Sequence, residues 1–191
     1  METTLAAEPV PVTSIDAGAL ADFDAVVRDH QPAVSRFLLA SLREREPAEN
    51  LTQECFLRAY RARQSFRGDA SVRTWLMRIA VNLLNDHRKS ARLRFWRQVA
   101  QTSLDTSFTG DWLADRRTSP EAEAVARQQV EAVWRAAAEL SERQRTVFLL
   151  RFVEEMGIGE IAAATGIQEG TVKAHLFRAV EAVRRKVRET P

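Results

Sequence analysis

The feature that most constrains this chain is a pair of helical patterns near the C-terminus that meet at Gly166. The first pattern is a short apolar run from Ile158 to Thr165, and Gly166 suits the positive-φ position of a tight turn between two helices. The second pattern is longer, and its apolar residues share one face: Val172, Leu176, Ala179 and Val183. This spacing predicts a helix-turn-helix whose second helix can enter a DNA groove, with an ordinary helical hairpin as the alternative.

The packing of this motif and its outer surface follow from the same pattern. Small side chains at Ala162 and Ala163 are expected where the two helices cross closely. The outer face of the second helix is polar, basic and aromatic, with Thr171, Lys173, His175, Phe177 and Arg178. Positive charge continues beyond it at Arg184, Arg185, Lys186 and Arg188, which favours a nucleic-acid surface.

The charge of the chain is local rather than global. A net charge of +2 over 191 residues is nearly neutral. Between Arg78 and Arg97, however, a single acid, Asp86, stands among six basic residues, whereas the segment from Asp22 to Glu54 is mildly acidic. The first segment suits nucleic acid and the second suits a protein partner.

Several classes of protein are disfavoured by what the chain lacks. Cys55 is the only cysteine, so an internal disulfide or a cysteine-based metal cluster is excluded, and a buried small residue is favoured over a redox sensor. No metal-ligand spacing, carboxylate cluster or Gly-rich phosphate loop is present, so no metal, cofactor or enzymatic activity is expected. No apolar run reaches the roughly 20 residues that span a bilayer, and no signal peptide is recognisable, so a cytoplasmic protein is predicted.

The predicted fold is all-α, with two small helical domains joined by a flexible linker. Residues 1–19 are expected to form a flexible tail, 20–97 the first domain, 98–119 the linker and 120–191 the second domain. In the first domain, Pro32 is expected to kink or break the first helix, the second helix spans Pro47 to Gln64, and Asp69 or Ser71 caps the third. In the second domain, helices are expected to begin at residues 119–121 and at a capping box over 141–144, the latter continuing to Phe152.

A stripe on the third helix points to a base-contacting role. Residues spaced by four, three and four share one face beside the apolar face: Arg78, Asn82, Asn85 and Lys89. Asparagine is a mediocre helix former, so this stripe suggests hydrogen bonds to bases or phosphates, with a solvated polar face as the alternative. The loop from Phe66 to Asp69 could hold a base lifted from the stack.

Two long runs resemble one family. NLTQECFLRAYRARQSFRGDASVRTWLMRIAVNLLNDHRK, Asn50 to Lys89, resembles the polymerase-binding and promoter-opening domain of extracytoplasmic-function (ECF) sigma factors, the small group of the sigma-70 family. Leu140 to Val187 resembles the second domain of the same family, in the same order along the chain. The resemblance implies a dissociable initiation factor that binds core RNA polymerase through its β′ clamp and β subunit, reads promoter DNA, and performs no catalysis itself.

The resemblance also implies which residues make each surface. The segment that docks on the β′ clamp falls on Asn50, Leu51, Gln53 and Glu54, continued by Leu57, Arg58 and Arg61, with Asn50 in place of the usual aspartate. Recognition of the −10 element falls on Phe66, Arg67, Gly68 and Asp69, with Arg78, Asn82, Asn85, Arg88 and Lys89 on the helix that follows. Recognition of the −35 element falls on Gly170, Thr171, Lys173, Ala174, His175, Phe177 and Arg178. Within this set, Ala174-His175 stands where the family often has a Ser-Arg pair.

Inhibition is implied by the resemblance too. Small sigma factors are usually held by an anti-sigma factor that is often anchored in a membrane, and Val153 and Met156 are expected to be spare apolar residues for that contact. A small-molecule substrate is not expected. The alternative is a stand-alone helix-turn-helix regulator that binds an operator as a dimer, which leaves the surface from Asn50 to Arg61 unexplained.

Overall fold

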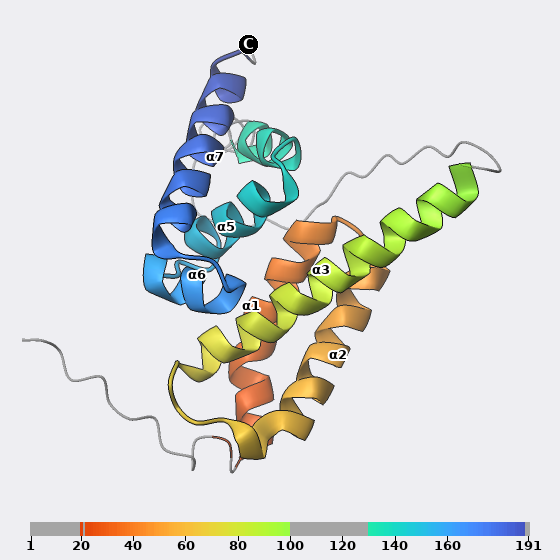
Figure 1. Cartoon of the computed structure of the whole chain (residues 1–191), viewed down its shortest axis with the longest axis vertical. Helices are drawn as coiled ribbons and strands as arrows, with labels where there is room; N and C mark the ends of the chain where they lie inside the picture. Colours follow the sequence, from red (N-terminus) through yellow and green to blue (C-terminus); the bar gives the residue numbers. More distant parts are fainter. Residues whose placement is uncertain (1–19, 21, 100–129, 190–191) are drawn as a thin grey trace, which may run out of the picture.

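The structure is a computed structural model that describes residue 20 and residues 22–99 and 130–189, with the backbone alone for residues 92–99. Within these residues the chain forms helices and turns and no strand, which confirms the predicted all-α class. Two helical groups lie against each other, one of α1 to α3 and one of α5 to α7 (Figure 1). The predicted tail, residues 100–119 of the predicted linker and the helix start at residues 119–121 lie outside the described residues, whereas residues 98 and 99 still belong to α3.

Helix α1 spans Phe23–Leu42 and begins at Asp22, whose Oδ1 accepts a hydrogen bond from the Ala25 backbone N at 3.0 Å. The helix runs through Pro32 without interruption, so of the expected kink or break the break is wrong. Pro32 is exposed, which keeps its ring away from the core. The buried face of α1 continues on both sides of it, from Val26 to Phe37, and its packing holds the helix together across the missing N–H.

Helices α2 and α3 complete the first group. Helix α2 spans Arg45–Ala62 and continues into a short 3₁₀ turn, η2, over Arg63–Ser65, while α3 spans Val72–Val99. Ser71 caps α3, since its Oγ accepts from the Thr74 backbone N at 3.1 Å. The core between the three helices is fully apolar at its centre, with Phe37, Leu38, Cys55, Leu76, Met77 and Leu84 completely buried.

The second group carries the helix-turn-helix. Residues 130–138 are helical, and α5 spans Glu142–Phe152 behind the predicted capping box, in which Gln144 Oε1 accepts from Ser141 N at 3.3 Å. Helix α6 spans Ile158–Thr165, ends at Gly166 with φ 71°, and is followed by α7 over Glu169–Glu189. These bounds confirm the predicted motif.

Two local expectations about the motif need correction. Ala163 is exposed and Ala164 is buried instead, because the apolar face of α6 continues from Ile161 by a step of three. Met156, expected to be a spare apolar residue, is completely buried within the core and offers no surface to a partner.

The two groups pack through four helices. Helix α6 lies against α3, and α5 lies against α1, whereas α2 and α7 face away from this contact on opposite sides of the molecule (Figure 1). The contact between the groups is called the domain junction below. It leaves α2 and the outer face of α7 uncovered.

Candidate polymerase- and DNA-binding surfaces

The residues predicted to dock on polymerase lie on one exposed face of α2. Their spacing of three and four residues brings them into line along the helix, with Asn50, Gln53, Leu57, Arg58 and Arg61 exposed and Leu51 and Glu54 half-buried. Leu57 keeps 51% of its surface exposed, which is high for a large apolar side chain. Glu54 Oε1 accepts from Arg58 Nε at 2.7 Å, so the charges on this face are paired with each other at its surface.

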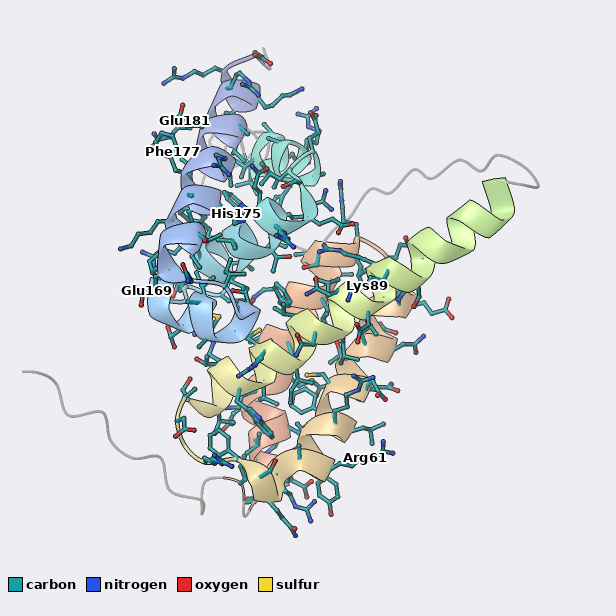
Figure 2. All side chains as sticks on the ribbon, in the orientation of Figure 1. Arg61, Lys89, Glu169, His175, Phe177 and Glu181 are labelled. Atoms are coloured by element: carbon teal, nitrogen blue, oxygen red, sulfur yellow. The ribbon has the colours of Figure 1, made fainter. Side chains whose placement is uncertain are left out.

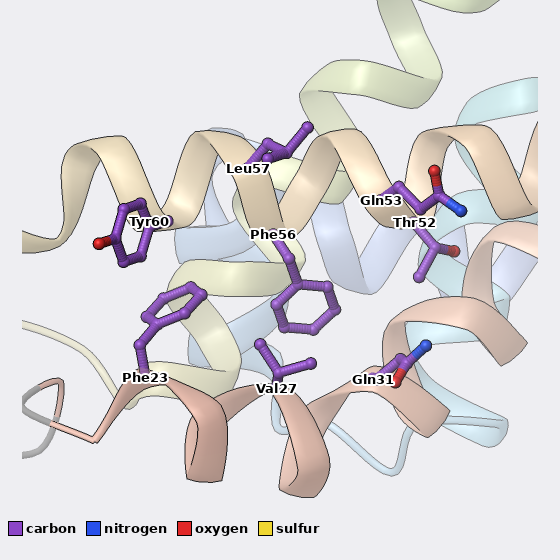
Figure 3. Close-up of a pocket in the computed structure, with 8 residues that line it drawn as sticks. All are labelled: Phe23, Val27, Gln31, Thr52, Gln53, Phe56, Leu57 and Tyr60. Atoms are coloured by element: carbon purple, nitrogen blue, oxygen red, sulfur yellow. The ribbon is translucent and has the colours of Figure 1, made fainter.

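A groove beside this face separates α1 from α2 (Figure 3). It has a volume of about 420 Å³ and is lined by Phe23, Val27, Gln31, Thr52, Gln53, Phe56, Leu57 and Tyr60. Phe23 and Tyr60 close one end edge to face, with ring centroids 5.2 Å apart, and the Arg63 guanidinium lies over the Tyr60 ring at 3.7 Å from its centroid. The α2 face therefore has an apolar groove along one side and the ion pair between Glu54 and Arg58 at its surface.

The predicted base-capturing loop is anchored to α3. The Phe66 ring packs against Trp75 with centroids 5.1 Å apart, and Gly68 adopts φ 75°, a conformation that favours glycine. Arg67 and Asp69 remain exposed on either side of Gly68. The packing of Phe66 thus fixes the loop while its polar side chains point into solvent.

The stripe on α3 lies on one exposed face, as its spacing predicts. Arg78, Asn82, Asn85 and Lys89 are all exposed, and Lys89 lies beside Asp86 at 3.9 Å. Lys89 is labelled on α3 in Figure 2. Among the described residues, no hydrogen bond or ion pair joins these four side chains to the second helical group.

Arg88 differs from its neighbours on α3. Its Nη1 donates to Thr146 Oγ1 of α5 at 3.3 Å, and its Nη2 donates to the Ser41 carbonyl at 3.4 Å. Burial lowers the pKa of this guanidinium from its ordinary value, and the carboxylate of Glu142 opposes that shift. In this arrangement the Arg88 guanidinium is half-buried and hydrogen-bonded to both helical groups, so it is not free on the exposed stripe.

The predicted −35 surface lies on the outer face of α7. Figure 2 shows His175 and Phe177 on the side of the molecule opposite Arg61. Gly170, Thr171, Lys173, Phe177 and Arg178 are exposed, and Phe177 retains 70% of its surface. Ala174 is half-buried toward the body of the domain.

His175 is the distinctive member of this face. It is half-buried, and its Nδ1 has no hydrogen-bond partner within the described part of the chain. Burial lowers the pKa of the imidazole, and Arg178 and Arg143 lower it further. The ring is therefore held toward its neutral form, which cannot make the bidentate contact to guanine that an arginine makes.

Cys55 is buried at the centre of the first group. Its Sγ lies 3.6 Å from the Leu76 carbonyl, and burial raises the pKa of its thiol to about 12. A thiol of that kind is a weak nucleophile at neutral pH, which favours the expected role as a small core residue.

Sequence reasoning missed the polar cluster in the domain junction. Glu154, in the turn between α5 and α6, is completely buried and is hydrogen-bonded to Arg36 of α1 and Arg73 of α3. Thr74 Oγ1 donates to Glu160 Oε1 at 3.2 Å nearby. The sequence holds no signal for this cluster, since its members are separated by 81 to 118 residues.

Family profiles match both helical groups. The profile described as Sigma-70 region 2 matches residues 26–101, and the profile described as Sigma-70, region 4 matches residues 130–183. The first covers most of α1 and all of α2 and α3 with the loop and stripe, and the second covers α5, α6 and most of α7.

Curated relatives agree over most of the chain. The chain is 34% identical to the RNA polymerase sigma-H factor of Pseudomonas aeruginosa, over 90% of this chain and 89% of the relative. It is 30% identical to the ECF RNA polymerase sigma factor SigW of Bacillus subtilis, over 91% of both chains, and 33% identical to the ECF sigma-E factor of Escherichia coli K12, over 72% of both. The chain belongs to the ECF group of sigma-70 family RNA polymerase sigma factors, which bind core polymerase and promoter DNA to direct transcription initiation.

Solved structures share the fold. The sigma factor RpoE in complex with the anti-sigma factor NepR, from Bartonella quintana, superposes with a TM-score of 0.70 at 20% identity, covering 89% of this chain and 99% of that one. CnrH in complex with the cytosolic domain of CnrY gives a TM-score of 0.65 at 20% identity, covering 94% and 99%.

The described residues lack a membrane-spanning helix and a metal-binding cluster. Among residues 20, 22–99 and 130–189, no helix is both long and apolar enough to cross a bilayer. The same part of the chain contains no group of three or more His, Cys, Asp or Glu residues placed to hold a metal ion.

Proposed function

We propose that this sigma factor divides its work among three separate surfaces, as the resemblance implies. The α2 face, Asn50 to Arg61, docks on the polymerase β′ clamp. The Phe66–Asp69 loop and the stripe Arg78, Asn82, Asn85 and Lys89 capture and hold bases of the −10 element. The outer face of α7 reads the −35 element.

The exposure of these three surfaces on different helices is the observation that supports this division. Each predicted contact residue except Leu51, Glu54, Phe66, Gly68, Arg88, Ala174 and His175 is exposed. A large apolar side chain that is exposed on a surface can anchor a binding partner. Leu57 on α2 and Phe177 on α7 each supply such a side chain. A phenylalanine at a DNA-facing position can make apolar contact with a thymine methyl group.

The protein catalyses no reaction itself in this proposal. It acts in the cytoplasm, where polymerase and promoter are found. We also propose that an anti-sigma factor controls it, because the sigma factor RpoE, which shares this fold, was solved in complex with the anti-sigma factor NepR. Because Met156 is completely buried, it cannot contact the anti-sigma factor, and we expect that contact on the exposed faces of α2 and α7 instead.

Run-off transcription with purified core polymerase and a fragment library from the source genome tests the function. The expected result is a set of transcripts that start at defined promoters and depend on the added chain. Binding to core polymerase without DNA should also be detectable, since an operator-binding regulator would not need it. Operator binding at nanomolar concentration by the free chain, without any polymerase binding, would support the dimeric regulator instead.

A further inference from the structure

The strongest unassigned feature of the molecule is the carboxylate of Glu154 inside the domain junction. Arg36 Nε and Nη2 donate to its two oxygens at 2.9 Å each, a bidentate geometry. Arg73 Nη2 donates to Oε2 at 3.3 Å and also to the Glu154 backbone carbonyl. The Glu154 side chain is 0% exposed, whereas the side chains of Arg36 and Arg73 are 43% and 36% exposed.

All the charged partners of Glu154 come from the other helical group. Within its own group the carboxylate has no hydrogen-bond partner among the described residues, so its pairing exists only while the two groups are in contact. Two further polar contacts cross the junction, Thr74 to Glu160 near the carboxylate and Arg88 to Thr146 about four turns further along α3. Separation of the groups would return every one of these side chains to water.

Such a contact is specific but easily reversed. The free-energy cost of removing a carboxylate and a guanidinium from water is nearly as large as the free energy gained by their attraction, so a buried pair adds little net stability. Such a pair nevertheless strongly favours the one arrangement in which both charges are paired. Removing one partner alone is costly, because the remaining charge stays buried without compensation. A junction of this kind suits two states that must interconvert.

The closed arrangement cannot serve a promoter. Elements centred at −10 and −35 are about 25 base pairs apart, or about 85 Å at about 3.4 Å per base pair. Domains of this size have radii of gyration of about 12 Å, so two domains in contact have centres only about 25–30 Å apart. The chain between the described groups, roughly 30 residues, could reach about 100 Å when extended, which is enough for the open arrangement.

We infer that Glu154, held by Arg36 and Arg73, is an autoinhibitory clasp that keeps the free sigma factor closed and must release before promoter binding. This inference rests on the proposed function. The α2 face stays uncovered in the closed arrangement, so the clamp can dock first and the clasp opens afterwards.

The test measures closure in the free chain by energy transfer between two dyes. Cysteines introduced at Glu46 on α2 and Glu181 on α7, both exposed, carry the dyes. Cys55 is buried and its thiol pKa is raised to about 12, so it competes poorly for the label. The wild-type background should give mostly high transfer.

Glu154→Gln removes the charge at constant shape and should lower the ratio of closed to open molecules about 10- to 100-fold. Arg36→Ala removes the partner of Glu154 in the other domain and should also lower the ratio of closed to open molecules. Glu155→Gln makes the same chemical change at an exposed neighbour and should leave the ratio unchanged.

Transcription completes the test, with unlabelled single variants at limiting sigma factor. Glu154→Gln and Arg36→Ala should both raise run-off product, because apparent affinity scales with the competent fraction. Unchanged transfer in Glu154→Gln would overturn the inference, as would opening by Glu154→Gln alone, which would indicate local damage to its own domain. Opening without any gain in transcription would also overturn it. The energy-transfer measurement uses neither polymerase nor DNA, so it shows whether the free chain is closed independently of the proposed function.

Discussion

The α2 face and the domain junction both carry arginine–glutamate pairs of nearly the same length. On α2, Arg58 lies 2.7 Å from Glu54; in the junction, Arg36 lies 2.9 Å from Glu154. The α2 pair joins residues four apart on one exposed helix, whereas the junction pair joins residues 118 apart around a carboxylate with no exposed surface.

The difference shows that burial, rather than distance, sets what such a pair does. An exposed pair is worth about 0–1 kcal/mol and can be given up when a partner docks. A buried pair fixes one arrangement of the groups around it. The α2 face is therefore suited to exchange its contacts for polymerase, and the junction is suited to hold the two domains in a defined orientation.

The largest expected effect tests the α2 side of this comparison. Leu57→Ala should weaken binding to core polymerase by about 2–4 kcal/mol, or about 30- to 1,000-fold, if this exposed leucine is the apolar anchor of the interface. Folding should change little, since half of the side chain already faces water. Binding is measured by fluorescence anisotropy with labelled sigma factor.

Arg45→Ala is the matched control for Leu57→Ala. Arg45 lies on the same helix, exposed, before the predicted docking segment begins. Its replacement should leave polymerase affinity near the wild-type value. Equal losses in both variants would mean that substitutions anywhere on α2 disturb binding, and would contradict a specific apolar anchor at Leu57.

The next effect concerns the stripe on α3, which the junction leaves exposed. Asn82→Ala should impair promoter opening more than formation of the closed promoter complex, because loss of a buried hydrogen-bond partner costs about 1–3 kcal/mol, or about five- to 150-fold in the open fraction. Permanganate footprinting of the melted bubble measures it. Ser90→Ala on the same helix is the control, and unchanged opening in Asn82→Ala would leave the stripe as a solvated face.

Much of the fold could be predicted because its determinants are local. The capping box at Ser141, the short helix from Ile158 and the left-handed turn at Gly166 each depend on residues within a few positions of one another. The exposed stripe from Arg78 to Lys89 follows from helical spacing alone. The continuity of α1 through Pro32 did not follow, because tertiary packing on both sides of the proline outweighed its local preference.

The junction could not be predicted because its determinants are distant in sequence. Glu154 stands beside Glu155 and has the local pattern of an ordinary surface acid, yet one is buried and the other exposed. Arg88 belongs to a basic run that suggests phosphate binding, yet it lies half-buried against Ser41 and Thr146. In both cases the decisive partner comes from an element 47 or more residues away.

A smaller effect is expected at the rim of the junction, where Glu160 is exposed. Its Oε2 accepts from Gly157 N at 2.8 Å, which satisfies a backbone N–H at the start of α6. Glu160→Ala should lower the free energy of unfolding by about 1 kcal/mol and the melting temperature by a few degrees. Glu160→Gln keeps a side-chain oxygen for the cap and should melt near the wild type in circular dichroism. Equal melting of Glu160→Ala and the wild type would show that the cap contributes nothing.

The smallest effect is expected for the exposed pair between Arg45 and Glu49, although its 2.8 Å length is slightly shorter than the 2.9 Å of the junction pair. Arginine precedes glutamate here, the less favourable order on a helix, and the cation lies at the helix N-terminus, where the backbone dipole opposes it. A double-mutant cycle of Arg45→Ala and Glu49→Ala, followed by urea unfolding, should therefore give a coupling of at most about 0.5 kcal/mol. A coupling above about 1.5 kcal/mol would mean that distance outweighs burial, and the contrast between the α2 face and the junction would fail.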